Sequence, residues 1–425
     1  MAREISASER RRALTLGSLG GGLEFYDFVI YAVFADVIGQ TFFPSGDATA
    51  NLLAAFTVFA IGYLARPLGG ILFSHYGDRL GRRNMLRLSI GGMAGATILM
   101  GLMPGYDNIG IAASVIFVGL RIVQGMSLGG EIPGALVLIT ETMPRHRGLA
   151  CGVLFMMINV GLLVAHAVQW GIVAALPAED VSAFGWRIGF LLGGAIALAG
   201  FLLRVRLSES PAFEEMEAAT HKVPLAMLFA RHGRQVLAGF LIAGIGASIV
   251  SLLYLYLDTY LTRILGYPGP AMASASVLGI LMFSLPMPLA GWLGDRLGLK
   301  LPTLAGGLAL IVAVVPAYVW MAGDAASVLP ALALLSILAS FAWGAAPAPL
   351  TAIFPTAVRY SGVAVSYNLG FAIIGGLTPL AATALIRWSG DSQMPAYLLI
   401  LFTVLGLAAL AAVRLLPPED RAAQG

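Results

Sequence analysis

Two copies of one charged stretch occur in this chain, Gly77-Asp78-Arg79-Leu80-Gly81-Arg82-Arg83 and Gly294-Asp295-Arg296-Leu297-Gly298-Leu299-Lys300. Each copy follows a long apolar run, and the two aspartates are 217 positions apart (295 − 78) in a chain of 425 residues. Glycines allow a tight turn, a carboxylate caps a helix N-terminus, and basic residues stay on the cytoplasmic side of a membrane. An isolated charged loop would not recur at half the chain length. The repetition therefore predicts two tandem versions of one membrane-embedded unit.

The composition is that of a membrane protein. Apolar residues make up 59% of the chain and charged residues only 11%, against about a quarter charged in soluble domains. Apolar runs of about 20 residues or more predict membrane-spanning helices. Twelve such runs are expected, at 14–43, 50–76, 85–103, 109–140, 149–176, 184–205, 236–261, 271–293, 301–321, 328–350, 362–386 and 396–415.

Basic residues concentrate in alternate loops, which predicts the orientation. With a cytoplasmic N-terminus, twenty of the 25 Lys and Arg residues fall on the cytoplasmic side, as the positive-inside rule requires, so both termini are expected there. The net charge of +3 gives no reason to expect a nucleic-acid partner. The lone Cys151 excludes an intramolecular disulfide, and no cleavable signal peptide is expected before the first span. We expect a multi-pass protein of the bacterial inner (plasma) membrane.

The duplication divides the chain into three parts. We expect an N-terminal six-helix bundle at 1–205, a polar cytoplasmic linker at 206–234 and a C-terminal six-helix bundle at 235–425. Two parallel six-helix repeats form an architecture of secondary transporters, with the substrate site between the halves near the bilayer midplane. The expected fold class is therefore all-α and integral to the membrane, with twelve transmembrane helices in two pseudo-repeats.

Ionisable residues interrupt several apolar runs, and each costs about 2.5–3.5 kcal/mol on insertion scales, so each needs a reason. In the first span, Glu24, Asp27 and Tyr31 share one helix face at i, i+3 and i+7. Counting about 1.5 Å of helix per residue from the expected ends of the spans places Glu24, Asp27 and Arg121 near the bilayer centre. We expect a carboxylate–guanidinium cluster in a central cavity, in which Asp27 or Glu24 pairs with Arg121. The alternative is a permanent ion cluster that only holds helices in register.

The fourth span carries Arg121, Gln124 and Glu131 within one arc of its helix. Glu131 lies toward the cytoplasmic side and is a second candidate proton carrier. Arg66 precedes Pro67 in the second span, where it either acts in the site or braces a helix end.

In the fifth span, His166 shares a face with Asn159 and Gln169. A ligand or proton role and a hydrogen-bonded core histidine are both open for His166. The second half is poorer in buried charge, and its candidates for shaping the pocket are Tyr254, Asp258, Trp343, Tyr367 and Asn368. Aromatic residues there also fit simple packing, and Asp258 fits a place at the outer rim.

Charged turns at the inner face are expected to act as a gate. Glu141 and Arg147, near the inner end of the fourth span, are expected to clasp the turn around Asp78. The full set of expected gating residues is Asp78, Arg79, Arg82, Glu141, Arg147, Asp295 and Arg296.

These motifs resemble a known family over essentially the whole chain. The paired Gly-Asp-Arg-x-Gly turns look like the signature loops of the major facilitator superfamily. Further motifs resemble those of its metabolite–proton symporter branch. Among them are Glu24-Phe25-Tyr26-Asp27-Phe28, Arg66-Pro67-Leu68-Gly69-Gly70, Arg121 with Gln124-Gly125, and Phe354-Pro355-Thr356 with Arg359. That branch includes transporters of α-ketoglutarate, citrate, shikimate and proline or betaine.

The resemblance and the buried charges together lead us to expect proton-coupled import of a small organic acid, a di- or tricarboxylate or a related metabolite, by alternating access. Asp27, Glu24 or Glu131 would carry the proton, and Arg121 would hold a substrate carboxylate by its forked geometry. The expected pocket residues beside Arg121 are Tyr31, Gln124, Asn159, His166, Tyr254, Trp343 and Asn368. No cofactor or metal is expected, and the partners are the substrate, a proton and the lipid bilayer, with the monomer as the functional form.

Three other readings stay open. A proline or betaine symporter belongs to the same family, while a drug-exporting antiporter is disfavoured because residues 150–174 contain no proline. A membrane enzyme or a sensor is disfavoured because the sequence has no metal-ligand spacing, nucleotide loop or nucleophile constellation.

Overall fold

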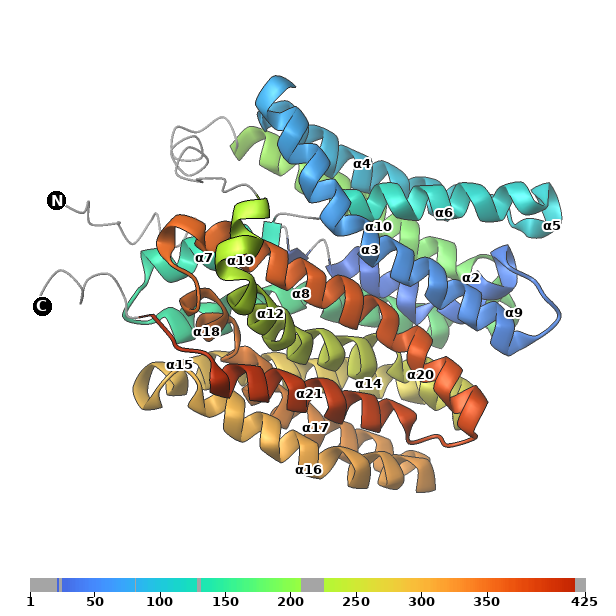
Figure 1. Ribbon diagram of the computed structural model, residues 1–425. Coiled ribbons are helices and arrows are strands. Elements are labelled where there is room, and N and C mark those ends of the chain that lie inside the picture. Colours follow the sequence, from blue (N-terminus) through green and yellow to red (C-terminus); the bar gives the residue numbers. More distant parts are fainter. Residues whose placement is uncertain (1–20, 23–24, 81, 128–130, 208–224, 417–425) are drawn as a thin grey trace, which may run out of the picture.

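The computed structural model describes the chain except for residues 1–20, 23–24, 81, 128–130, 208–224 and 417–425. Only the backbone is described at 70–80, 82–87, 89–90, 131, 200–207, 225–227 and 270–271. Throughout the described residues the regular elements are helices, which lie side by side along one direction (Figure 1). The expected all-α membrane fold is confirmed.

The first half is a series of helices and short helical turns. It contains the helix Phe25–Val33, α2 (Ala35–Phe42), α3 (Ala48–Leu80), α4 (Arg82–Leu102), α5 (Tyr106–Ile109), α6 (Ile111–Met126), α7 (Glu131–Thr142), α8 (Arg147–Ala175), α9 (Ala178–Asp180), η1 (Val181–Gly185) and α10 (Trp186–Leu207).

The second half has the same character but more π-helical turns. It contains α12 (Leu225–Val250), η2 (Ser251–Leu255), α13 (Leu257–Thr259), η3 (Tyr260–Ile264), α14 (Gly269–Ser284), α15 (Met287–Leu297), α16 (Leu301–Gly323), η4 (Ala325–Ser327), α17 (Val328–Gly344), α18 (Pro347–Ala352), α19 (Thr356–Leu369), η5 (Gly370–Gly375), α20 (Gly376–Ser389) and α21 (Met394–Ala412). The α12 helix begins inside the segment expected as a linker and bends at His232.

Nine helices of the described residues are long and apolar enough to cross a membrane. The number is ten if Phe25–Val33 and Ala35–Phe42, which meet at 67°, are counted as one bent span. The spans expected at 85–103 and 109–140 contain shorter described apolar helices, Gly91–Leu102, Ile111–Met126 and Ile132–Thr142. The second of these spans includes residues 128–130, which lie outside the described residues.

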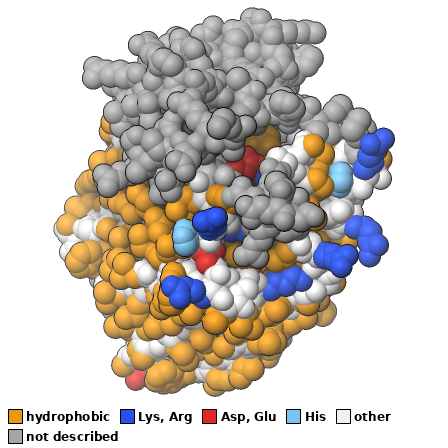
Figure 2. All heavy atoms as spheres, turned by 90° about the vertical axis from the view of Figure 1, so that its left-hand side faces the viewer, with side chains coloured by type: hydrophobic (Ala, Val, Ile, Leu, Met, Phe, Trp, Pro, Cys, Tyr) orange, Lys and Arg blue, Asp and Glu red, His pale blue; other side chains and the backbone are white. Residues whose placement is uncertain are grey.

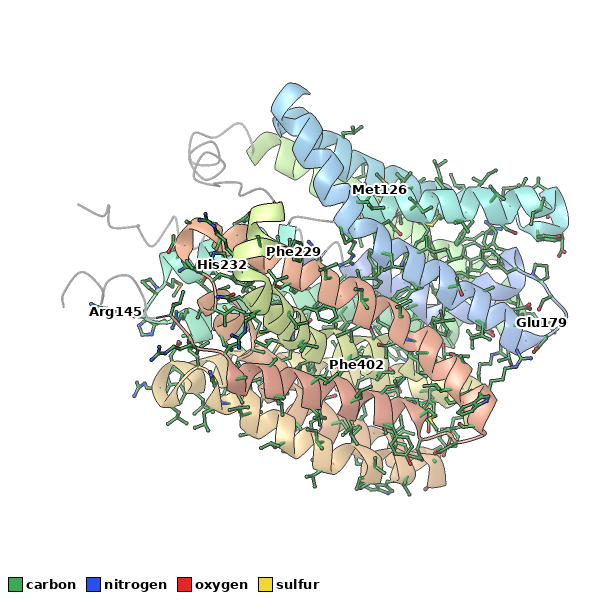
Figure 3. All side chains as sticks on the ribbon, in the orientation of Figure 1. Met126, Arg145, Glu179, Phe229, His232 and Phe402 are labelled. Carbon is green, nitrogen blue, oxygen red and sulfur yellow. The ribbon has the colours of Figure 1, made fainter. Side chains whose placement is uncertain are left out.

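Charge separates the two ends of the helix bundle. Arg145 and His232 lie at one end, and Glu179 lies at the other (Figure 3). The first end, here named the basic end, carries Arg145, Arg231, Arg234, Lys300 and Arg359, and Lys and Arg side chains are visible on it in Figure 2. The other end, named the acidic end, carries Asp36, Asp47, Asp107, Glu179 and Asp324.

The two halves meet along a seam in which α8 packs against α14 and α15, and α3 packs against α20 and η5. The contact of α8 with α15 is close because both faces carry glycine. A Cβ atom on Gly148 would lie 2.3 Å from the carbonyl oxygen of Gly291, and one on Gly152 would lie 2.3 Å from that of Met287. Small residues thus allow two backbones to touch, as is common between membrane helices.

Candidate functional site

The centre of the first half holds a buried guanidinium, that of Arg121 on α6, with no exposed surface. Its Cζ lies 4.2 Å from the ring centroid of Phe28, 4.3 Å from that of Tyr31 and 5.5 Å from that of Phe59. Phe28 and Tyr31 are three residues apart and therefore share one face of the first helix. A desolvated cation over an aromatic ring gains about 2 kcal/mol or more, so the rings offset part of the cost of burying Arg121.

A chain of hydrogen bonds connects Arg121 to Asp27 across three helices. Arg121 Nη1 donates to Gln124 Oε1. Gln124 Nε2 donates to Thr97 Oγ1 at 2.8 Å, and Thr97 Oγ1 donates to Asp27 Oδ2 at 3.2 Å. All four residues are at most 1% exposed.

The sequence predicted a direct ion pair of Arg121 with Asp27 or Glu24. For Asp27 this prediction is wrong, while Glu24 lies outside the described residues. The side chains of Asp27 and Arg121 are both described, and no salt bridge joins them within that part of the chain; Thr97 and Gln124 stand between them. The guanidinium lies over the rings of Phe28 and Tyr31, and Phe28 is about 100° around the first helix from Asp27. The carboxylate and the guanidinium therefore face the same polar chain from its two ends.

Several atoms of this site have no hydrogen-bond partner among the described residues. These atoms are Asp27 Oδ1 and the Nε and Nη2 atoms of Arg121. Buried polar atoms are nearly always paired, so such atoms call for a ligand, a proton or a water. The arrangement leaves two donors on Arg121 for an anion and one acceptor on Asp27 for a proton.

A second cation lies close to the first. The Cζ of Arg66 on α3 is 4.1 Å from the ring centroid of Phe28 and 4.2 Å from that of Tyr63, and Arg66 is 2% exposed. Arg66 and Arg121 share the Phe28 ring, which brings two like charges within about 8 Å of each other, where they repel. The described part of this site therefore holds two cations, Arg66 and Arg121, and one carboxylate, Asp27.

Of the other residues expected in the pocket, Tyr31 lies beside Arg121 and Asn159 lies at the seam between the halves. Tyr31 donates its hydroxyl to the carbonyl of Ala55 at 2.8 Å, so its ring, not its hydroxyl, faces Arg121. Asn159 on α8 is 2% exposed and donates to Met287 Sδ at 3.6 Å, across the seam.

The second-half candidates form packed surfaces. Tyr254 donates to Ser336 Oγ at 2.8 Å inside the second half. Trp343 packs edge-on against Phe155 of α8, with ring centroids 5.2 Å apart, and so lines the seam. Asn368 on α19 is 8% exposed.

His166 and Asp258 meet across the seam, toward the acidic end. His166 Nε2 on α8 lies 3.8 Å from Asp258 Oδ2 on α13. The side chains are 0% and 7% exposed, so Asp258 is a buried partner of His166 and not a residue of the outer rim. The carboxylate also lines a cavity of about 230 Å³, together with Gln169 of α8, Asp36 of α2 and Arg263 of η3.

The basic end of the seam holds two of the expected gating residues in contacts between the halves. Asp295 accepts hydrogen bonds from the backbone N–H groups of Gly148, at 2.7 Å, and Leu149, at 2.8 Å. His146, the residue before α8, makes no side-chain capping bond, so Asp295 supplies the cap for this helix from the other half.

Glu141 forms an ion pair of 2.8 Å with Arg359 of the second half. The expected clasp with the turn around Asp78 stays a prediction, because the side chains of that turn lie outside the described residues. Arg147 is the first residue of α8, and Arg296 is exposed with its Cζ 5.1 Å from the Trp292 ring of its own helix. The remaining expected residues, Glu24 and the side chains of Asp78, Arg79, Arg82 and Glu131, lie outside the described residues.

Comparison with known proteins decides the family. The profile of the family described as Major Facilitator Superfamily matches residues 17–368.

The chain belongs to the Major Facilitator Superfamily.

Curated relatives of this superfamily member are transporters, not enzymes. A proline/betaine transporter of Salmonella typhimurium is 32% identical over 421 residues, covering 95% of this chain and 83% of the relative. A citrate-proton symporter of Salmonella typhi is 31% identical over 94% of each chain. A shikimate transporter of Escherichia coli is 33% identical over 90% of each chain.

Solved structures show the same Major Facilitator Superfamily fold. A proton:xylose symporter, XylE, bound to a brominated glucose superimposes with a TM-score of 0.72 at 17% identity, covering 98% of this chain and all of the other. The inward-open xylose transporter XylE from E. coli gives a TM-score of 0.70 at 16% identity, over 97% of this chain and 99% of the other. At this identity the likeness concerns the fold alone.

The polar chain of the superfamily member's central site includes a residue that the sequence does not single out. Thr97 of α4 joins Gln124 to Asp27, but a single hydroxyl in an apolar span carries no charge or spacing signal. Such hydroxyls usually bond to the carbonyl one turn back, as Thr97 also does to Met93 at 3.0 Å. The side chain becomes visible as a site residue only when α4 is placed beside the first helix and α6.

Proposed function

We propose that this chain is a proton-coupled symporter that imports a small organic acid by alternating access, as a monomer. The observation that carries the proposal is the buried Arg121, whose Nε and Nη2 have no partner among the described residues while its Nη1 is linked through Gln124 and Thr97 to Asp27. A guanidinium with two free donors matches a carboxylate in a forked arrangement.

Proton binding at Asp27 would change the hydrogen bonds of the chain that leads to Arg121 and the charge that balances its guanidinium. Thr97 has one hydroxyl proton, which either Asp27 at 3.2 Å or the Met93 carbonyl at 3.0 Å accepts. When Asp27 takes up a proton it becomes a donor itself, so Thr97 turns its proton to Met93 and accepts from Asp27. The negative charge that balanced the guanidinium is then gone, and a substrate carboxylate takes its place.

Charge favours an organic acid over a compatible solute. With Asp27 protonated, the described site keeps the positive charges of Arg66 and Arg121 and no carboxylate. The aromatic faces of Phe28 and Tyr31, which would suit a quaternary ammonium, already hold these guanidinium groups. A proline or betaine symporter is the second candidate, because a proline/betaine transporter is 32% identical over 95% of this chain.

Orientation completes the proposal. The basic end would face the cytoplasm, because loops rich in Arg and Lys stay on that side of the inner membrane. Substrate and proton would then enter from the acidic end.

The test uses the full chain in liposomes with an inward proton gradient and labelled citrate, α-ketoglutarate, shikimate, phthalate, proline and betaine. We expect uptake of at least one of the acids, with dissipation of the gradient abolishing accumulation. Asp27→Asn should remove accumulation against a gradient but keep substrate exchange, and Arg121→Lys should weaken acid binding about tenfold or more, because an ammonium lacks the fork. Asp324→Asn, at an exposed carboxylate far from the site, is the control.

Uptake of betaine or proline alone would replace the acid with the second candidate. Full proton-driven accumulation by Asp27→Asn would remove Asp27 from the coupling step.

A further inference from the structure

We propose that His166 and Asp258 form a proton-binding site shared by the two halves, and that a proton held between them keeps the acidic end of the seam closed. His166 belongs to α8 of the first half and Asp258 to α13 of the second. The inference rests on the proposed symport only in that it supplies a second proton site beside Asp27. A site that bridges the moving halves would connect protonation directly with their movement.

The geometry leaves room for one proton. His166 Nδ1 lies 3.1 Å from the carbonyl oxygen of Leu162, which only accepts hydrogen bonds, so the ring proton is on Nδ1. Nε2 of the neutral ring is then an acceptor, and it faces Asp258 Oδ2 at 3.8 Å. Neither Nε2 nor Oδ2 has a hydrogen-bond partner among the described residues. The Gln169 amide of α8 also interacts with the Asp258 carboxylate, but it does not lie between Nε2 and Oδ2 as a hydrogen-bond donor to either atom. A proton on Nε2 would place a donor between these two facing acceptors.

The Asp258 carboxylate is held by a hydrogen bond on one side and borders a cavity on the other. Ser276 Oγ of α14 donates to Asp258 Oδ1 at 2.5 Å. The cavity of about 230 Å³ that Asp258 lines also reaches Arg263, whose side chain is 48% exposed. A proton therefore has a route from the acidic end to the pair.

The backbone around Asp258 is irregular in a way that fits movement. The short α13 helix that carries it lies between two π-helical turns, η2 and η3. Single π-helical turns are frequent at functional sites. The partner, His166, lies inside the long regular helix α8, so movement of the pair would come from the second half.

Other ionisable groups near the pair are occupied or absent. Asp36 and Arg263, at the mouth of the cavity, pair with each other. Tyr254 of η2 donates to Ser336, and Arg187 of α10 donates to the carbonyls of Gly101 and Met103. The ring of Tyr260 in η3 packs near Tyr318, with ring centroids 5.3 Å apart, and a phenol does not change its charge in the range from pH 5 to pH 9. The helices α14 and α17 contain no Asp, Glu, His, Lys, Arg, Cys or Tyr. His166 and Asp258 are therefore the groups whose protonation changes the charge at this point of the seam.

The sign of the effect follows from the charges. With a proton on both ring nitrogens, the imidazolium and the carboxylate, 3.8 Å apart, form an ion pair that attracts α13 to α8. Without it, a lone pair faces a negative oxygen, and the attraction across the seam is lost. Acid pH should therefore close the acidic end and alkaline pH should release it.

The experiment measures the distance across the acidic end directly. Spin labels are attached to Glu179→Cys, in the first half, and Trp388→Cys, in the second, which is 84% exposed. The background carries Cys151→Ser, and labelling at one pH precedes reconstitution into nanodiscs. Double electron–electron resonance is then recorded between pH 5 and pH 9 without substrate.

In the parent protein we expect the ratio of open to closed protein to rise about tenfold from pH 5 to pH 9. A change of this size corresponds to the loss of one charge-assisted interaction across the seam. His166→Asn and Asp258→Asn should each abolish this pH dependence. His146→Asn, at an exposed histidine of the basic end, is the matched control and should keep it.

Ser276→Ala gives a test that leaves both titrating groups in place. It removes the donor to Asp258 Oδ1, so the pH midpoint should move while the amplitude stays. A pH-independent distance in the parent protein, or an unchanged profile in both Asn variants, overturns the proposal. The measurement contains no substrate, so its failure leaves the symport proposal standing, whereas loss of coupling in Asp27→Asn with an intact pH response separates the two sites.

Discussion

At the basic end of the seam, Asp295 binds two backbone N–H groups of α8, and α8 touches α15 through glycines. At the acidic end, two ion pairs at the surface join the halves, Arg263 with Asp36 and Arg387 with Asp47, and the buried His166–Asp258 pair adds to them only when it is protonated. In the second of these pairs the side chains are 51% and 45% exposed. Exposed ion pairs contribute about 0–1 kcal/mol, while hydrogen bonds to a charged group contribute about 1.5–3 kcal/mol each. The basic end is therefore closed more firmly, and the acidic end should open first.

The largest effect is expected from a methyl group placed in the helix contact at the basic end. In Gly291→Ala the new Cβ would lie 2.1 Å from the carbonyl oxygen of Gly148, a backbone atom that cannot turn away. Overpacking of this kind costs about 1–3 kcal/mol, so α8 and α15 should separate. Spin labels at Arg145→Cys and Leu297→Cys, in a Cys151→Ser background, would report a larger open fraction at this end.

Gly171→Ala is the matched control for this change. Gly171 is also on α8, but a Cβ there meets no atom within 4 Å. Equal distance distributions for Gly291→Ala and the parent protein would show that the close helix contact does not hold the basic end.

The next effect is expected at the cap that Asp295 provides. Asp295→Asn keeps the shape but loses the charge at the N-terminus of α8 and leaves one oxygen for two N–H groups. Because one of the two N–H groups keeps an acceptor, the loss should be at the lower end of the range for a hydrogen bond to a charged group, about 1.5 kcal/mol, or roughly tenfold in the ratio of open to closed protein. The same spin-label pair measures it.

Asp324→Asn is the control that tests whether loss of any helix-capping carboxylate opens the basic end. Asp324 caps η4 within one half, by accepting from the N–H of Ala326 at 3.2 Å. Its loss should leave the distance across the basic end unchanged, and an equal response in both variants would argue against a lock formed by Asp295.

The difference between the two ends also explains what the sequence could predict. The repeated turn predicted two units and a capping carboxylate, because glycine, aspartate and arginine at fixed spacing have local consequences. Asp295 does cap a helix, but a helix of the other half. That partner depends on how the halves pack, which neither copy of the turn encodes.

The same limit applies to the candidate site. Asp27 and Arg121 could be identified because charge in an apolar span is costly wherever it lies. Their connection through Thr97 depends on three helices meeting at one depth. His166 and Asp258 are 92 positions apart (258 − 166) on different halves, so no periodicity within one helix relates them.

A smaller effect is expected at the exposed pair of the basic end. Glu141 and Arg359 are 2.8 Å apart, with side chains 40% and 16% exposed. Glu141→Gln should therefore shift closure at this end by only about 0.2–1 kcal/mol, and less at high salt, because mobile ions screen such pairs. Recording the spin-label distance in 50 mM and 500 mM salt would check this. A shift as large as that of Asp295→Asn would mean that side-chain charge, not backbone capping, closes the basic end.

The smallest effect is expected at Asp47 of the acidic end. The N–H of Thr49, at 2.9 Å, and then the Arg387 guanidinium lower the pKa of this carboxyl group. Because the folded pKa lies below the unfolded one, the contribution to stability is present above the unfolded pKa and is lost as pH falls through the folded pKa. Asp47→Asn should slightly lower the thermal unfolding temperature at pH 7, and the difference from the parent protein should shrink at pH 3, which lies below the ordinary pKa of the carboxyl group. Thermal unfolding in nanodiscs at both pH values measures this. A large loss at pH 7, together with a wide opening of the acidic end, would show that the exposed pairs and not the buried His166–Asp258 pair control that end of the seam.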